Sequence, residues 1–324
     1  MLDFALKTAG TLLSPPGKRA RLSILIYHRV LRQTDPLFPF DVDAARFEVQ
    51  MKTLRYLFHI LPLSEAVFRL KNGTLPARSA CITFDDGYAD NAEVALPILQ
   101  HLQIPATFFV ADGFLDGGIM FNDRIIEVVR NIIHPILDLT PLGLDRLSLT
   151  SFEQKRTAIA TLLSRLKYTS LEKREELLAG IEHIAGITPN ANLMMRCEQV
   201  RELHNAGMEI GGHTVNHPIL ASIDMASSES EIIRNRNRLQ DITDSPVKLF
   251  AYPNGKPHTD YNAEHVALVK KLGFDAAVST RCGVSSRHSD CFQLPRFTPW
   301  DISPSRFSLR LLNNLRETVI QPLT

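Results

Sequence analysis

Short apolar runs alternate along the chain with stretches whose apolar residues recur every three or four positions. The runs are typical of buried strands, and the recurring spacing is typical of helices that pack on one face. The pattern predicts strands over residues 23–27, 80–84, 106–110, 208–212, 248–252 and 276–279, and helices over residues 47–57, 91–102, 197–205, 228–241 and 261–272. Because strand and helix alternate, the sequence predicts parallel strands joined by crossover helices.

Residues from about 121 to 190 interrupt this alternation and have the pattern of a run of helices. Capping-box spacing occurs twice there, so we expect helices to open at Thr150 and Thr169. The charged residues of this region indicate a solvated surface, with a lid or a partner surface as the alternative. The chain is therefore expected to have three parts: an N-terminal extension (1–22), an α/β domain (23–324), and a helical insertion within that domain (about 121–190).

Composition excludes several classes of protein. The chain has 324 residues, 44% of them hydrophobic, which is enough for a large core. Its net charge is +1, so no strong field favours nucleic acid or an anionic membrane. The four cysteines, Cys81, Cys197, Cys282 and Cys291, form no CxxC pair, which argues against a zinc ribbon or a thioredoxin-like site.

The first residues carry little targeting information. Lys18 and Arg19 follow the apolar stretch 1–13, which is the wrong order for a secretory signal. No window is apolar for the ~18 residues that a membrane-spanning helix needs. We therefore expect a cytoplasmic protein without a transmembrane segment. Weak peripheral association with a membrane through residues 1–13 is the alternative.

Two motifs carry the candidate chemistry. Asp85 and Asp86 end the apolar run 80–84, and His213 and His217 follow the run 208–212. Taken singly, these are ordinary turn carboxylates and loop histidines. Taken together, they lie on the face where parallel α/β barrels build their sites, and on a helical turn the i, i+4 spacing would bring both imidazoles to one side. One carboxylate and two imidazoles leave a metal with an open position, which is the catalytic pattern.

Thr-Phe-Asp-Asp-Gly-Tyr (83–88) and His-Thr-Val-Asn-His-Pro (213–218) together resemble the polysaccharide deacetylase family, the NodB-homology enzymes of carbohydrate esterase family 4. The resemblance extends from about residue 23 to 300. It implies a distorted (β/α)7 barrel that removes acetyl groups from N-acetylated sugars with a divalent metal, usually zinc. Two histidines and one carboxylate also accept cobalt, manganese or nickel.

Carried over by position, the resemblance makes Asp85 the catalytic base and Asp86, His213 and His217 the metal ligands. The metal would polarise the acetamide carbonyl and lower the pKa of water, and Asp85 would take the water's proton.

This sequence departs from the family's third motif. The segment 250–255 has Ala251 where the family has arginine and Asn254 where it has tyrosine. The backbone N–H near Asn254 could still stabilise an oxyanion. The arginine that holds the base must then come from elsewhere, and we expect it to be Arg296. Asp275 resembles the fourth motif and is expected to support the same carboxylate.

The histidine of the family's fifth motif is missing, because no histidine follows His288. Residues 24–30 resemble the first strand of exopolysaccharide and biofilm deacetylases, a subgroup whose barrel is circularly permuted. In that subgroup an early histidine is the acid, so we expect His28 to protonate the leaving amine. Tyr88 and Trp300 are expected to line the sugar site.

The sequence therefore predicts a metal-dependent deacetylase that acts on an acetylated glycan or glycan precursor and cleaves a non-peptide C–N bond. Two alternatives stay open: an inactive carbohydrate-binding protein on the same fold, and a hydrolase of a non-sugar amide. The sugar, the metal and the oligomeric state are not specified.

Overall fold

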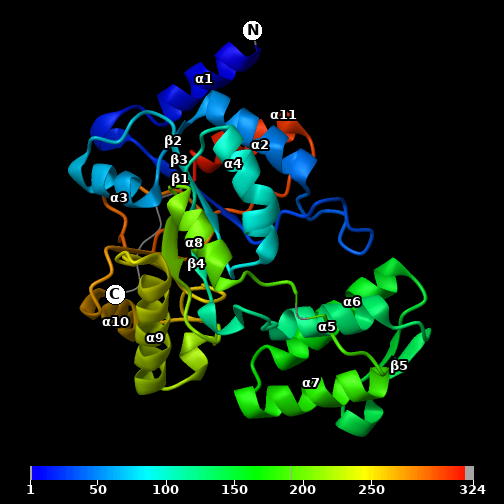
Figure 1. Cartoon of the computed structure of the whole chain (residues 1–324). Helices are drawn as coiled ribbons and strands as arrows, with labels where there is room; N and C mark the ends of the chain where they lie inside the picture. Colours follow the sequence, from blue (N-terminus) through cyan, green and yellow to red (C-terminus); the bar gives the residue numbers. More distant parts are fainter. Residues whose placement is uncertain (1, 191, 318–324) are drawn as a thin grey trace.

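The computed structural model describes residues 2–190 and 192–317. The predicted N-terminal extension (1–22) and α/β domain (23–324) therefore each include residues outside the described ones. Within the described residues, seven strands form one curled parallel sheet in the order β1-β3-β4-β7-β8-β9, with β2 beside the start of β3 (Figure 1). The strands are β1 (Leu22–Tyr27), β2 (His59–Ile60), β3 (Ser79–Phe84), β4 (Thr107–Val110), β7 (Glu209–Gly212), β8 (Leu249–Ala251) and β9 (Ala276–Val278). The predicted parallel α/β fold is confirmed.

Alternate residues of the strands face two different cores. On β3, Ala80, Ile82 and Phe84 join a cluster with the outer helices, while Cys81 faces an inner cluster. Because side chains alternate along a strand, Thr83 and Asp85 lie on the same side as Cys81. The helices around the sheet are α2 (Ala44–Leu57), α3 (Leu63–Asn72), α4 (Leu96–His101), α8 (Cys197–Asn205), α9 (Met225–Thr243), α10 (Ala263–Lys271) and α11 (Pro304–Asn314).

The sheet does not close into a full barrel, and a loop segment covers the gap between its edges. Its edge strands, β1 and β9, are separated by residues 291–297. In this segment, Leu294 forms a single parallel bridge to Val278 of β9, and Phe297 forms one to Leu25 of β1. The sequence predicted a barrel, and the structure has a curled half-barrel. Residues 291–297 cover its open seam and are joined to each edge by a single bridge.

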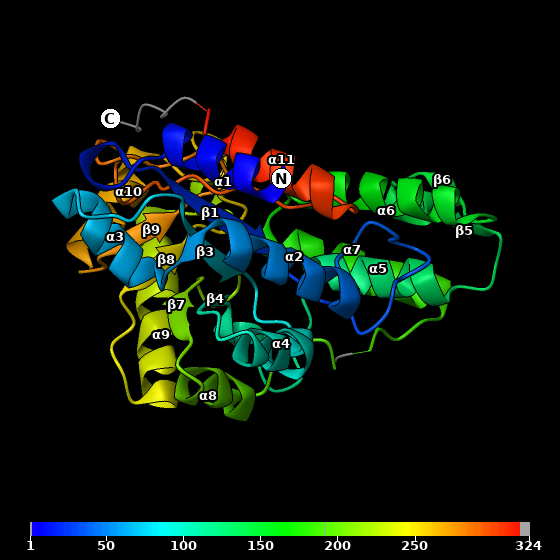
Figure 2. The same ribbon diagram turned by 90° about the horizontal axis from the view of Figure 1, so that it is seen from above.

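The region from 121 to 187 has its own hydrophobic core. Its helices lie together at one end of the molecule (Figure 2). It contains three helices, α5 (Phe121–Asn131), α6 (Phe152–Leu166) and α7 (Leu171–Ala185). It also contains an antiparallel pair, β5 (Ile136–Asp138) and β6 (Arg146–Ser148), so the expectation of helices alone was wrong.

The helix caps of this region are shifted by one residue from the expected positions. Ser151 and Ser170, not Thr150 and Thr169, cap α6 and α7 with their side chains. The shift follows from local competition, because the Thr150 hydroxyl bonds to the Gln154 side chain instead.

The pattern of apolar residues did not identify β2, α3 or α11, and it gave a helix at α1 (Leu2–Leu13) only as the alternative of a membrane-surface segment. In the structure, α1 lies beside α11 and α2 (Figures 1 and 2). Among the described residues, no helix combines the length and the apolar character needed to cross a bilayer.

Candidate active site

The candidate residues gather at the carboxyl ends of the strands, where each leaves the sheet by a turn. Asp85 and Asp86 follow β3, and His213 follows β7. Asp86 has a φ of 76° and Gly87 a φ of 92°, so the chain reverses sharply there. This left-handed turn, which is unfavourable for a residue with a side chain, separates the directions of the two adjacent carboxylates.

Asp86, His213 and His217 place one ligand atom each within 4.8 Å of one another. The Asp86 Oδ1 atom lies 3.4 Å from His213 Nε2 and 3.5 Å from His217 Nε2. His213 donates its Nδ1 proton to the Ala251 carbonyl oxygen at 2.8 Å, which turns its Nε2 atom toward Asp86. All three side chains are largely buried, so the three atoms form a preorganised group.

The two histidines do not lie on a helical turn, so that part of the prediction was wrong. They lie on a loop after β7 in which Thr214 (φ 63°) and His217 (φ 51°) are left-handed. Glu231 of α9 holds the loop, because its carboxylate accepts hydrogen bonds from the backbone N–H groups of Val215 and Asn216. The imidazole centroids are 4.7 Å apart as a result.

Asp85 is held by a buried arginine. Arg296 donates to Asp85 Oδ1 and Oδ2 through its two terminal nitrogens, each at 2.7 Å. The same guanidinium donates to the Ser279 carbonyl oxygen and to the Thr83 hydroxyl. Both side chains of the pair are almost fully buried, so the structure places Arg296 where the sequence expected the replacement arginine.

Burial and nearby charges act in opposite directions on these groups. Burial raises the pKa of Asp85, but the charge and hydrogen bonds of Arg296 outweigh it, and the pKa lies below its usual value. For Asp86, the hydrogen bond from His213 and the two neighbouring imidazoles likewise outweigh burial, and hold the pKa well below its usual range. Burial lowers the pKa of His217 to about 4, so this imidazole is neutral and ready to bind a cation.

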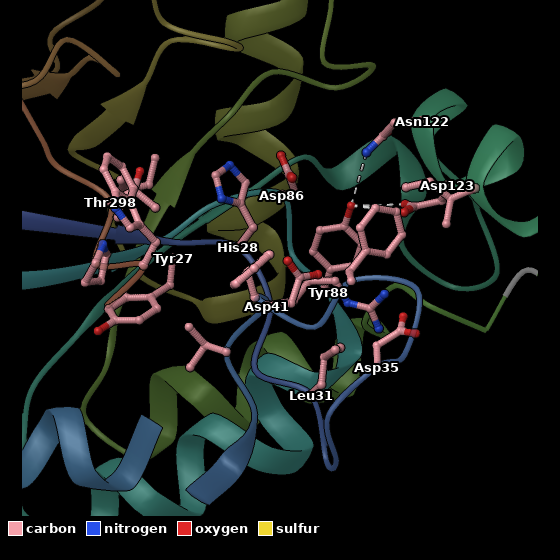
Figure 3. A pocket seen from close by; sticks show the side chains of 18 of the residues that line it. Tyr27, His28, Leu31, Asp35, Asp41, Asp86, Tyr88, Asn122, Asp123 and Thr298 are labelled. Atoms are coloured by element: carbon pink, nitrogen blue, oxygen red, sulfur yellow. Dashed lines mark hydrogen bonds between the residues drawn. The ribbon is translucent and has the colours of Figure 1, made fainter. Parts of the chain in front are cut away.

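His28 lies on the wall between two cavities. One, of about 470 Å³, contains Asp85, Asp86, His213 and His217. The other, of about 440 Å³, runs between the loop after β1 and α5. His28 and Asp86 line both cavities, and Figure 3 shows the two side chains at the edge of the second one. The expected acid therefore lies beside the candidate metal group.

The expected sugar-binding residues line different parts of this double cavity. Asn254, with a φ of 58°, lines the first. Tyr88 is buried beneath the second, where its hydroxyl bonds to Asp123 and Asn122 (Figure 3). Trp300 is 54% exposed at the rim of the second, with the Arg310 guanidinium 4.3 Å from its ring centroid.

Asp275 does not belong to the site. It is exposed and precedes β9, and its backbone N–H bonds to the carbonyl oxygen of Lys248, just before β8. This is the end of the strands opposite the candidate ligands, so the expectation that Asp275 supports Asp85 was wrong.

Two supporting residues were missed by the sequence analysis. Asn235 of α9 accepts a hydrogen bond from the His213 backbone N–H and donates to the Val110 carbonyl oxygen, which ties the β7 loop to β4. Asp123 of α5 is buried in the second cavity, where burial raises its pKa to about 7. Neither residue has a motif around it, and only the tertiary fold shows its partners.

The comparisons with known proteins agree with this geometry. The sequence profile of the polysaccharide deacetylase family matches residues 72–134 and 181–277. Over 281 residues the chain is 22% identical to YxkH of Bacillus subtilis (strain 168), a protein assigned to the polysaccharide deacetylases, covering 86% of this chain and 71% of that one. A segment of 75 residues is 39% identical to the poly-beta-1,6-N-acetyl-D-glucosamine N-deacetylase of Staphylococcus aureus, covering 23% of this chain and 26% of that one.

Solved structures show the same fold. The Streptococcus pyogenes deacetylase PplD has a TM-score of 0.59 at 20% identity, covering 91% of this chain and 98% of that one. IcaB from Ammonifex degensii has a TM-score of 0.58 at 17% identity, covering 92% and 98%. The chain belongs to the polysaccharide deacetylase family. Members of this class are hydrolases that remove acetyl groups from N-acetylated sugars. The likeness of fold to IcaB fits the circularly permuted subgroup that residues 24–30 resemble.

Breaking the buried pair should destabilise the fold. In Arg296→Met, Asp85 stays buried without its partner, and we expect the free energy of unfolding to fall by about 3–5 kcal/mol. The double variant Asp85→Asn with Arg296→Met removes the orphan charge and should recover part of that loss. Urea unfolding of the metal-free proteins measures both. Equal stability of the single and double variants would contradict a charge-based role for the pair.

Asp123 should make stability depend on pH. Its folded pKa of about 7 lies above the value of about 3.9 for an unfolded aspartate, so the folded state binds more protons between these values. The free energy of unfolding should therefore fall as the pH rises from about 4 to about 7. The pKa difference limits this fall to about 4 kcal/mol.

The variant Asp123→Asn should lose this dependence and be more stable than the wild type at pH 8, with the difference shrinking toward pH 5. Unfolding of the metal-free proteins at both pH values measures it. A difference that is the same at pH 5 and pH 8 would show that Asp123 does not titrate in this range.

Proposed function

We propose that this chain is a metal-dependent deacetylase of N-acetyl amino sugars in a polysaccharide or a glycan precursor. The observation that carries the proposal is the convergence of Asp86, His213 and His217 beside a carboxylate, Asp85, that is separately held by Arg296. A group of ligands next to a base with its own partner is the arrangement that metal-assisted hydrolysis requires.

The residues fit a divalent ion. Two imidazole nitrogens and one carboxylate oxygen point at a common space, and the Ala251 carbonyl fixes the tautomer of His213. Asp86 has a depressed pKa and His217 is neutral above about pH 4, so neither needs to lose a proton when metal binds near neutral pH. Although burial opposes it, the hydrogen bond with Asp86 raises the pKa of His213, so this imidazole would release its proton as metal binds. Zinc suits this donor set, and cobalt, manganese and nickel are alternatives for the test below.

A bound metal would supply Lewis-acid chemistry: polarisation of the acetyl carbonyl and a lower pKa for water. The chain's own residues supply the rest. Asp85 accepts the proton of the attacking water, and Arg296 keeps this carboxylate ionised and oriented. The backbone near Asn254 lines the same cavity and can donate to the oxygen on which negative charge develops.

His28 is the proposed acid for the leaving amine. His28 and Asp86 both line the two cavities, so they lie at the boundary between them. A sugar chain that occupied both cavities would pass this boundary. Tyr88 and Trp300 belong to the second cavity and are the proposed contacts for the rest of the glycan. The Staphylococcus aureus relative is named for a polymer of N-acetylglucosamine, which supports an amino-sugar polymer as the first substrate to test.

Metal content tests the site without knowledge of the substrate. Wild-type protein incubated with zinc should retain about one ion per chain after desalting, because three protein ligands converge. Asp86→Ala and His213→Ala should each lose it. The matched control is His101→Ala, which removes an exposed histidine of α4. Metal retained in both site variants would contradict the ligand assignment.

Turnover tests the acid. In His28→Asn, release of acetate from N-acetylglucosamine oligomers should fall by about 10²–10⁴-fold, the usual contribution of general acid–base catalysis. Metal content should stay at the wild-type level, since His28 is not in the ligand group. Unchanged acetate release would assign the acid role to another residue, and oligomer binding without acetate release by the wild type would favour a binding protein.

A further inference from the structure

The cavity that holds the candidate ligands has one wall built by the helical region. Phe121 and Asn122, at the start of α5, line it, and so do Leu163, Ser164 and Lys167, at the end of α6. The family profile matches the chain only up to residue 134 and again from 181. The α6 part of this wall thus lies in a stretch that the shared family sequence does not cover.

In the described part of the chain, Lys167 lacks the ion pairs that hold two arginines of this region. Arg124 pairs with Glu175 and Glu182, and Arg130 pairs with Asp35 and Glu127. Among residues 2–190 and 192–317, the Lys167 ammonium has neither a hydrogen bond nor an ion pair. The one contact recorded for it is the ring of Tyr168, 5.4 Å from the ammonium to the ring centroid.

The two carboxylates of the candidate site have partners other than Lys167. Arg296 pairs with Asp85, and the imidazoles of His213 and His217 face Asp86. Lys167 is therefore a surplus cation on the wall of the reaction cavity. A half-buried ammonium without a protein partner gains a charge-assisted hydrogen bond when an anionic ligand arrives, and a neutral ligand offers it much less.

We propose that Lys167 is a specificity residue that selects glycans carrying an anionic group, a carboxylate or a phosphate, on the acetylated sugar or its neighbour. The inference rests on the proposed function of the same cavity and adds the charge class of its substrate. The rigid core beneath α6 supports it, because Leu162 and Leu166 are buried next to Lys167 and fix the end of the helix in place.

Direct binding tests this inference separately from turnover. Titration calorimetry on the metal-free full chain would use three oligosaccharides of equal length: a neutral N-acetylglucosamine oligomer, one with a carboxylate on a neighbouring sugar, and one with a phosphate ester there. The wild type should bind one or both anionic oligomers about 10-fold more tightly than the neutral one, and added salt should reduce the difference. The comparison of the two anionic oligomers identifies which group is selected.

Lys167→Met should remove this preference without changing the affinity for the neutral oligomer, and Lys167→Arg should restore it. The matched control is Arg165→Met, which removes another cation near the end of α6. Arg165 is exposed, pairs with Asp145 and does not line the cavity. The inference is overturned if the wild type binds all three oligomers equally, or if the preference survives in Lys167→Met. Failure of the proposed function would show differently, as binding without acetate release by the zinc-loaded wild type.

Discussion

The buried ion pair between Arg296 and Asp85 is the constraint on which the site depends. A carboxylate in the interior of the half-barrel is unstable as an anion unless a cation and hydrogen bonds surround it. Arg296 provides both, and its remaining bonds to Ser279 and Thr83 fasten it to β9 and β3. The pair leaves Asp85 ionised while Asp86, one residue away, faces the imidazoles. Two adjacent carboxylates therefore have separate partners and can have separate tasks.

The surrounding structure positions these groups by backbone turns more than by regular elements. Asp86, Thr214, His217 and Asn254 are non-glycine residues with positive φ, and all of them lie at the site. Such conformations persist where tertiary contacts enforce them. Here the contacts are visible: Glu231 holds the histidine loop, and the Asn254 carbonyl oxygen accepts a hydrogen bond from the Thr280 hydroxyl.

The sequence was sufficient where a local pattern carried the information. The apolar run before Asp85 predicted both a strand and its end, and the two motifs predicted that Asp86, His213 and His217 would come together beside Asp85. The missing motif arginine pointed to Arg296, although 211 residues separate it from Asp85. Sequence could not reveal Asn235, Asp123 or Lys167, because their importance comes from elements that meet only in the folded chain. It also placed His213 and His217 on a helical turn, since spacing alone does not distinguish a helix from a loop held by Glu231.

The separation of Asp85 and Arg296 along the chain also affects synthesis. A ribosome adds about 5–20 residues per second, so roughly 10–40 s pass between the appearance of Asp85 and that of Arg296. During this interval the sheet from β1 to β8 can form, but an ionised Asp85 cannot be buried favourably within it. The last segment to close the half-barrel, residues 291–297, is also the one that delivers the compensating charge. The covering of the seam of the half-barrel and the pairing of Asp85 therefore belong to the same late step.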